Sequence, residues 1–359
     1  MHALQEIIDL TTRLIEVPSI ADRPAELKRV IDLIAGELDG LPGIRLHRIE
    51  EAGFPALAVT FGERTAAQII LNAHVDVVPG REEQFVAQVR DGRIYGRGAQ
   101  DMKAAAAVYI RLIKDLAAGG QSPDIAFQFV TDEEIGGDHG TRALLERGFT
   151  GELFIAGEPT DLQICNRAKG ILWLVVHQPG RPAHGSRPWE GSNPIIAIEE
   201  GLARLLERYP VPGEAVWRTT VTPSAIAGGD AQNRVPVRCD LKLDIRYVPE
   251  EGAEAVLRQV RTAFKGADVE LIHQGSALQT DESHPLVQRI AEAQEAITGQ
   301  RPRFYAEHFG SDARFYGERG MPAVCWGPIG AGLHSDEEWV EIESLQLYYT
   351  ALRHLVGIR

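Results

Sequence analysis

The sequence predicts an α/β protein. Its larger domain has a sheet with a mainly parallel centre, flanked by helices, and a ferredoxin-like α+β domain is inserted into it. Three observations predict this fold. Apolar segments of strand length alternate with segments of helical periodicity in the first half of the chain. The segments 69–74, 125–130 and 153–156 are mostly apolar, as strands covered on both faces are. The middle of the chain has the order strand, helix, two strands, helix, strand, which is typical of a ferredoxin-like unit.

The first half of the chain supplies the alternating elements. Apolar residues recur at helical spacing over 4–15 and 27–38, which predicts two amphipathic helices. Strands are predicted next, at 44–49, 56–61 and 69–74. Strong helix formers then predict a helix over 104–118 that ends at two glycines. A strand, a helix and a strand follow, at 125–130, 138–147 and 153–156.

The middle of the chain, 168–280, is predicted to be a separate inserted domain. Its elements are expected at 171–177, 193–209, 218–227, 237–247, 251–264 and 269–273. Asn193 and Pro194 favour the start of its first helix, because asparagine caps helices and proline suits their first turn. The larger domain then comprises 1–167 and 281–359. It closes with a helix, a strand and a helix, at 285–297, 323–326 and from 343 onward.

Composition and charge exclude several classes of protein. The 359 residues are 44% hydrophobic and 25% charged, which is ordinary for a globular chain with a large core. The net charge of -14 argues against nucleic acid or an anionic membrane as a partner. No segment has the roughly 20 apolar residues of a membrane helix, and the amino terminus lacks the pattern of a secretory signal. A cytoplasmic protein is therefore expected.

Acidic residues and histidines follow the strands of the larger domain or lie in its glycine-containing loops. They are His74, Asp76, Asp101, Glu133, Glu134, Glu158 and His334. In open α/β sheets, chemistry collects at the carboxyl ends of the strands. Divalent metal is the usual compensation for so much negative charge in a partly buried cleft. Imidazole with carboxylate favours zinc, cobalt or manganese, and the number of ligands suffices for two ions.

Each of these residues also has an ordinary structural interpretation. A single histidine at a strand end is commonly just hydrogen-bonded, and Glu133-Glu134 is typical of a solvated turn. Asp76 could cap a turn, Glu158 could be an ordinary loop residue, and His334 could lie at the start of a helix. Their occurrence together, in this order along the chain, favours a site.

The motifs around these residues resemble those of the dinuclear zinc aminoacylase and exopeptidase family. The sequence carries, in the order of that family, HVDVVPG at 74–80, GRGAQDMK at 96–103, DEEIGG at 132–137, GEPT at 157–160 and LHSDEEW at 333–339. The family includes acetylornithine deacetylase, succinyl-diaminopimelate desuccinylase, aminoacylases and glutamate-releasing carboxypeptidases. Many relatives have a small residue in place of Gln100 and glycine in place of Ala104, but neither change removes a ligand.

The resemblance implies two Zn²⁺ per chain, with Co²⁺ or Mn²⁺ as substitutes. The implied ligands are His74 and Glu158 for one ion, Glu134 and His334 for the other, and Asp101 as a bridge. Asp76 would accept a hydrogen bond from His74 and so fix its tautomer. Glu133 would be the general base that takes a proton from the attacking water. The larger domain would then be the metal-binding catalytic domain.

The resemblance also implies that the inserted domain is a lid and dimerisation domain. His184, in PAHGSRP, resembles a lid histidine that is delivered across a dimer interface to the substrate oxyanion. Asn233, Arg246 and Arg314 resemble positions that bind the substrate carboxylate, a task that suits the planar guanidinium. The alternatives are an exposed loop position for His184 and structural ion pairs for the two arginines.

The sequence thus predicts a zinc-dependent amidohydrolase that removes the acyl group from a small N-acyl amino acid, as deacetylases and desuccinylases do. A zinc carboxypeptidase or dipeptidase remains an alternative, and so does a non-catalytic relative that binds metal or peptide. The sequence has Glu133 in addition to all the expected ligands, which argues against a non-catalytic relative, because a binding protein needs no general base. The expected partners are a small carboxylate-bearing substrate and a second copy of the chain.

Overall fold

The computed structural model describes residues 2–120 and 123–358. Contacts between residues divide the chain into two compact units. Unit 1 comprises Met1–Asn166, Thr280–Tyr305 and Ser311–Arg359, and unit 2 comprises Arg167–Gln279 and Ala306–Gly310. The short segment Ala306–Gly310 was expected in the larger domain. It groups with unit 2, where the backbone N–H of Lys169 donates to the carbonyl of Glu307 at 3.2 Å.

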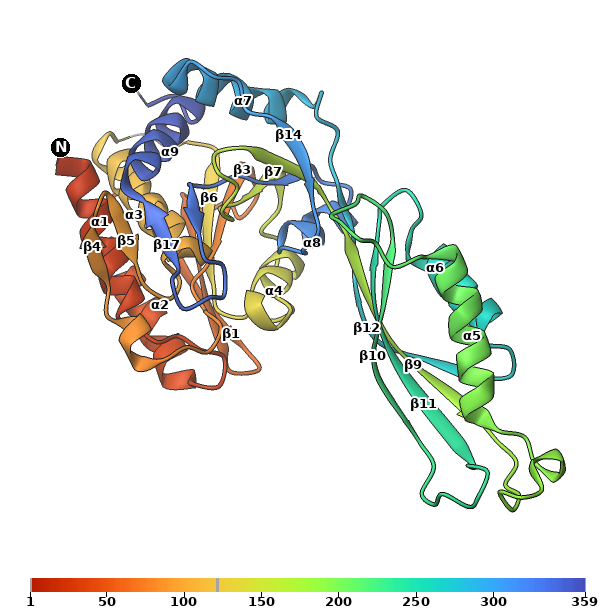
Figure 1. The fold of residues 1–359 in the computed structure, drawn as a ribbon. Helices are drawn as coiled ribbons and strands as arrows, with labels where there is room; N and C mark the ends of the chain where they lie inside the picture. Colours follow the sequence, from red (N-terminus) through yellow and green to blue (C-terminus); the bar gives the residue numbers. More distant parts are fainter. Residues whose placement is uncertain (1, 121–122, 359) are drawn as a thin grey trace. The chain divides into compact units, whose positions relative to one another are not determined.

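Unit 1 is built on a mixed sheet whose centre is parallel, as predicted (Figure 1). Its strands run in the order β1-β2-β6-β3-β7-β15-β8. The parallel centre consists of β6 (Ile125–Val130), β3 (Ala67–His74), β7 (Gly151–Ala156) and β15 (Ala323–Cys325). The antiparallel members are β1 (Ile44–Glu51), β2 (Phe54–Phe61) and β8 (Ile164–Ala168). The predicted α/β class is therefore confirmed.

Both faces of this sheet are covered, which explains its apolar strands. Leu57 and Val59 of β2 join a core with helices α1 (His2–Ile15), α2 (Pro24–Leu38), α3 (Ala104–Ala118), α7 (Pro285–Thr298) and α9 (Ile342–Leu355). The alternate residues Ala56 and Ala58 point to the other face and pack with Leu144 of α4 (Thr141–Glu146). Helix α8 (Ala313–Glu318) contacts α4, β7 and β15. Residues of either parity are therefore buried, and the strands read as continuous apolar runs.

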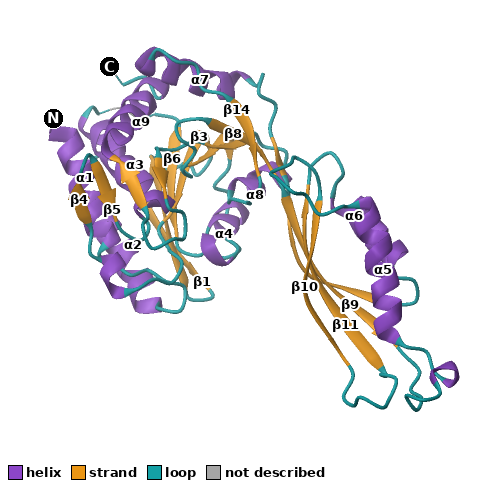
Figure 2. Cartoon of the chain, viewed as in Figure 1, coloured by secondary structure: helices purple, strands orange, loops and turns teal. Residues whose placement is uncertain are grey.

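Short elements complete unit 1 (Figure 2). A small second sheet has the order β16-β17-β5-β4 and is formed by Gly330–Ala331, Trp339–Glu341, Arg93–Tyr95 and Gln88–Arg90. Three single turns are η1 (Glu82–Phe85), η2 (Ala99–Lys103) and η3 (Glu133–Ile135). None of the helices in the part of the chain that the structure describes is long and apolar enough to cross a membrane.

Unit 2 has the predicted strand and helix order. Its elements are β9 (Gly170–Pro179), η4 (Pro188–Glu190), α5 (Pro194–Arg208), β10 (Thr220–Gly228), β11 (Arg238–Tyr247), α6 (Ala253–Ala263), β12 (Asp268–Gly275) and β13 (Leu278–Gln279). The antiparallel sheet has the order β10-β11-β9-β12, that of a ferredoxin-like fold. Leu241, Leu243 and Ile245 alternate along β11 and share one core with α5 and α6. Strand β14 (Phe304–Glu307) pairs with β8.

The start of α5 was predicted to be capped by Asn193. The side chain of Asn193 accepts a hydrogen bond from the backbone N–H of Ile195 at 3.0 Å, so it caps the helix as predicted. We expect Asn193→Ala to lower the free energy of unfolding by about 1 kcal/mol, because one N–H of the first turn loses its partner. Urea unfolding of the full chain measures this loss. Asn193→Ser keeps a capping oxygen and should change little; equal losses in both variants would contradict the capping role.

Candidate functional site

Three neighbouring strands of unit 1 bring acidic residues and a histidine to one edge of the sheet. Strand β3 lies parallel to both β6 and β7, so the carboxyl ends of all three meet there. His74 is the last residue of β3, Glu133 and Glu134 follow β6 in η3, and Glu158 lies two positions after β7. The parallel register alone therefore gathers side chains that are far apart in the sequence.

Asp101, in η2, lies between two histidines. One carboxylate oxygen, Oδ1, is 2.8 Å from Nε2 of His74, and the other, Oδ2, is 3.3 Å from Nε2 of His334. A second carboxylate lies beside each imidazole. Oε2 of Glu158 is 3.9 Å from Nε2 of His74, and Oε2 of Glu134 is 3.2 Å from Nε2 of His334. The five predicted ligands thus lie around Asp101, with one histidine and one further carboxylate near each of its oxygens, and we call these two groups the half-sites. Among the described residues, His74, Asp101 and Glu134 have ligand atoms that all lie within 4.8 Å of one another, close enough to hold a metal ion.

Two residues near this cluster, Gly98 and His334, have a positive φ angle. Gly98, just before η2, has φ 82°, and a β-carbon there would lie 2.7 Å from Val77 and 2.9 Å from Lys103. Only glycine fits such a close approach. His334 has φ 58° without being glycine, a conformation that costs about 1–2 kcal/mol. Such strain persists only where surrounding contacts fix the residue, and it is concentrated at functional sites.

The tautomer of His74 is set by Asp76, although not as expected. Nδ1 of His74 lies 3.1 Å from the backbone carbonyl oxygen of Asp76 and 3.6 Å from its carboxylate. The carboxylate accepts the backbone N–H of Glu134 at 3.0 Å through Oδ2, and its buried Oδ1 has no hydrogen-bond partner among the residues that the structure describes. A hydrogen on Nδ1 leaves the lone pair on Nε2, the atom that faces Asp101. The imidazole is thus oriented as a metal ligand needs to be.

The buried charges of the cluster shift one another's pKa. Burial, together with the charge of Glu158, raises the pKa of Glu133 well above its usual value. Burial raises the pKa of Glu158 against the opposing effect of His74, and Asp101 raises it further. Hydrogen bonds to Asp101 and Glu134 raise the pKa of His334 to about 10. These three shifts reduce negative charge or add positive charge, whereas, against the effect of burial, His74 and His334 lower the pKa of Asp101 and keep that carboxylate charged.

Two residues that sequence reasoning missed form hydrogen bonds with the segment that carries Asp101. Nη1 of Arg97 donates to Oε2 of Glu338 at 2.7 Å, and both side chains are almost completely buried. Oε1 of Glu338 accepts the backbone N–H groups of Gln100 and Asp101 at 3.0 and 3.2 Å. Both residues lie inside motifs of the sequence, but 241 positions separate them and nothing in their spacing indicates a pair.

Arg314, which was expected to bind substrate, donates hydrogen bonds to the backbone of unit 1. Nη1 donates to the carbonyl of Ser311 at 3.0 Å, and Nη2 donates to the carbonyl of Gly136. The side chain is buried and stacks on Phe315, with the guanidinium carbon 4.3 Å from the ring centroid. Since Gly136 directly follows η3, these bonds fix the turn that carries Glu133.

Unit 2 brings two of its predicted residues together. His184 and Asn233 line one pocket of about 380 Å³ with Pro182, Ala183 and Arg234. The backbone N–H of Gly185 donates to the carbonyl of Asn233 at 2.6 Å, which links the two loops. Nδ1 of His184 accepts the backbone N–H of Ser186 at 3.2 Å, so the ring hydrogen lies on Nε2. His184 therefore has a hydrogen-bond donor available at Nε2.

Arg246 adopts the structural alternative named for it. Its Nε and Nη2 donate to the two carboxylate oxygens of Asp244 at 2.8 and 3.1 Å. Asp244 also accepts from the indole N–H of Trp173 at 3.2 Å. Only Nη1 of the guanidinium stays outside this bidentate pair, so a substrate carboxylate would share Arg246 with Asp244.

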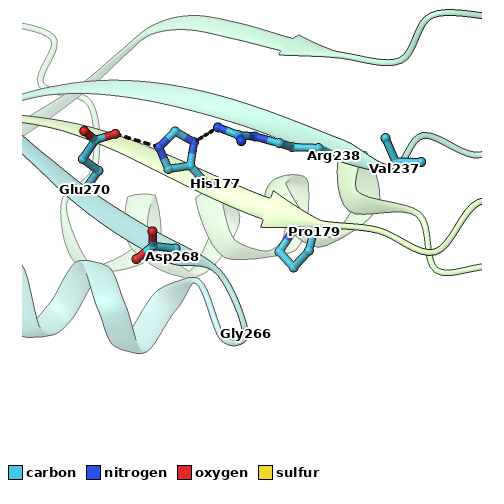
Figure 3. Close-up of a pocket in the computed structure, with 7 residues that line it drawn as sticks. All are labelled: His177, Pro179, Val237, Arg238, Gly266, Asp268 and Glu270. Atoms are coloured by element: carbon cyan, nitrogen blue, oxygen red, sulfur yellow. Dashed lines mark hydrogen bonds and ion pairs between the residues drawn. The ribbon is translucent and has the colours of Figure 1, made fainter.

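A larger pocket of unit 2, about 630 Å³, contains none of the predicted residues (Figure 3). His177 is one of the residues that line it, with Nδ1 2.8 Å from Asp240 and Nε2 2.9 Å from Glu270. Arg238 donates to the same Asp240 at 2.5 Å. The ring thus takes part in a surface network of ion pairs on the sheet, and the candidate site remains the cluster of unit 1.

The chain is similar to known proteins in both sequence and fold. Residues 70–357 match the profile of peptidase family M20/M25/M40. A succinyl-diaminopimelate desuccinylase of Maricaulis maris is 30% identical over 96% of this chain and 95% of its own length. The desuccinylase of Halorhodospira halophila is 28% identical over 98% of both chains. The crystal structure of aminopeptidase PepT from Bacillus cereus has a TM-score of 0.82 at 20% identity, covering 99% of this chain and 98% of PepT. This last likeness concerns the fold.

Proposed function

Because the chain belongs to peptidase family M20/M25/M40, we propose that it is a metal-dependent deacylase that removes the acyl group from a small N-acyl amino acid. Family membership makes the chain a hydrolase of amide bonds. One observation carries the proposal: a single carboxylate, Asp101, lies between two histidines that each face a further carboxylate. The names of the desuccinylase relatives support acyl removal as the reaction.

The residues present fit a pair of divalent ions. His74 and Glu158 would bind one ion, Glu134 and His334 the other, and Asp101 both. Imidazole with carboxylate suits Zn²⁺, with Co²⁺ or Mn²⁺ as substitutes, and the orientation of His74 directs Nε2 toward Asp101, the carboxylate that would share the ion. When bound, such ions lower the pKa of water and polarise a carbonyl.

The chain's own residues would carry the proton and position the substrate. Glu133 would accept the proton of the attacking water and pass it to the nitrogen of the leaving amine. The N–H at Nε2 of His184 would donate to the oxyanion as the carbonyl carbon becomes tetrahedral. Asn233 and Nη1 of Arg246 would bind the substrate carboxylate. We propose that Arg314 holds the turn after Glu133 and does not contact the substrate.

We further propose that unit 2 is the lid and dimerisation domain of a cytoplasmic homodimer. The shared pocket of His184 and Asn233 supports a role in substrate binding. The oligomeric state follows directly from sedimentation or light scattering in solution. A monomer with full activity would contradict the delivery of His184 from a second copy.

Removal of metal tests the proposed function. We expect about two ions per chain by elemental analysis, loss of hydrolysis after chelation, and recovery when Zn²⁺ is restored. The substrates to compare are N-acetyl amino acids, N-succinyl amino acids and dipeptides, and the acyl amino acids should be hydrolysed fastest. Preference for dipeptides would favour the peptidase alternative. Absence of both bound metal and hydrolysis would favour a non-catalytic binding protein.

A further inference from the structure

The ion pair between Arg97 and Glu338 is almost completely buried. The side chains of Arg97 and Glu338 are 4% and 1% exposed. The nearby pair Arg81–Asp336 is 66% and 64% exposed, although Asp336 lies only two residues before Glu338. A buried ion pair is retained only with good geometry and further hydrogen bonds, because both charges lose their hydration. Glu338 should therefore have further hydrogen bonds that compensate for the lost hydration.

Glu338 connects the segments of β17 and β5 at the point where the pairing of these two strands ends. Strand β17 pairs with β5 as far as Trp339 and Tyr95. Beyond that point, the backbone N–H of Gly96 donates to the carbonyl of Glu338 at 3.1 Å. The Glu338 carboxylate then accepts hydrogen bonds from the Arg97 guanidinium and from the backbone N–H groups of Gln100 and Asp101. Side-chain bonds thus continue the connection from the ladder to Asp101.

The same pair reaches the second histidine. Nη2 of Arg97 lies 3.5 Å from the carbonyl oxygen of His334, which is four residues before Glu338. The side chain of His334 is 48% exposed and its backbone is in the strained left-handed region, so its position depends on contacts from neighbouring residues. Its Nε2 must nevertheless stay near Oδ2 of Asp101, 3.3 Å away.

We propose that Arg97 and Glu338 are positioning residues of the candidate metal centre, and that their buried pair fixes Asp101 and His334 relative to each other. The inference rests on the proposed function, since it concerns the same centre. Neither side chain is among the proposed ligands, and both act through the backbone of residues that are. Partners of this kind commonly influence metal affinity or activity 10- to 100-fold.

Glu338→Gln tests this role with little change of shape. The amide oxygen can still accept the two backbone N–H groups, but the charge opposite Arg97 is lost. We expect Zn²⁺ to bind the metal-free variant about 10- to 100-fold more weakly by calorimetric titration. We expect kcat to fall by a similar factor while KM changes less than about twofold, because substrate contacts are untouched. The visible absorption of the Co²⁺-loaded variant should also change.

Asp336→Asn is the matched control, because it removes an acidic side chain from the same segment but breaks only the exposed pair with Arg81. Its metal affinity and kcat should equal those of the wild type. Arg97→Lys keeps the charge but lacks the second nitrogen that faces His334, and it should weaken metal binding to a smaller extent. The double change Arg97→Gln with Glu338→Gln should be no worse than Glu338→Gln alone, because the two residues act as one unit.

Two outcomes separate this inference from the function on which it rests. If the wild type binds two ions while Glu338→Gln and Arg97→Lys bind them equally tightly, the positioning role is wrong and the proposed function stands. If the wild type binds no Zn²⁺, both fail together. Should Glu338→Gln not fold in the metal-free state, Arg97→Lys alone decides the question.

Discussion

Glu133→Gln should lower kcat by about 10²- to 10⁴-fold while leaving the metal content unchanged. The amide has nearly the shape of the carboxylate but cannot take a proton from water. Burial and the charge of Glu158 raise the pKa of this side chain above its usual value, which is the direction that makes a carboxylate a stronger base. Steady-state kinetics on the preferred acyl amino acid and elemental analysis of the same samples measure the two quantities.

The control for this variant is Asp138→Asn. Asp138 lies five residues further along the same loop, is half exposed and pairs with Arg142 on the surface. Its replacement should leave both kcat and metal content unchanged. Turnover at the wild-type rate in Glu133→Gln would show that another group handles the proton.

Asp101→Ala should have an effect at least as large, through a different quantity. Since the Asp101 carboxylate faces both histidines, its loss removes one ligand from each half-site at once. We expect the bound metal to fall from two ions per chain to less than one, with hydrolysis too slow to detect. Elemental analysis after dialysis against excess Zn²⁺ measures the first, and product formation over hours measures the second.

His334→Ala provides the contrast for Asp101→Ala. It removes a ligand from one half-site only, so one ion per chain should remain bound at His74 and Glu158. Retention of two ions in Asp101→Ala, or identical metal loss in both variants, would contradict a shared carboxylate. The comparison thus tests the arrangement of the centre and not only its presence.

The larger features of the fold could be predicted because they leave periodic patterns. The apolar strands β3, β6 and β7 are continuous runs since helices cover both of their faces, and β11 alternates since one face of its sheet is covered. The small sheet of β4, β5, β16 and β17 was not predicted. Strands of two or three residues are too short to show a period, yet they bring the segments before Asp101 and after His334 together.

Some features of the candidate site could likewise be predicted from the sequence, and others could not. Residues that follow parallel strands must meet at one edge of the sheet, so the gathering of His74, Glu134 and Glu158 follows from the strand predictions. The pair of Arg246 with Asp244 was also readable, because residues two apart lie on the same face of a strand. The binding of Arg314 to backbone carbonyls depends on where a distant turn comes to lie. No local pattern indicates it.

The position of β15 in the sheet has a consequence for synthesis on the ribosome. β15 pairs with the outer edge of β7, but it is translated only after the whole of unit 2. At typical rates of elongation, the nascent chain waits roughly 10 to 30 s between these two strands. During that time the partly built sheet would present β7, an apolar strand, as an unpaired edge open to neighbouring chains. A domain inserted into another thus lengthens the period in which the host domain is prone to aggregate. Slower folding of unit 2 would not shorten that period.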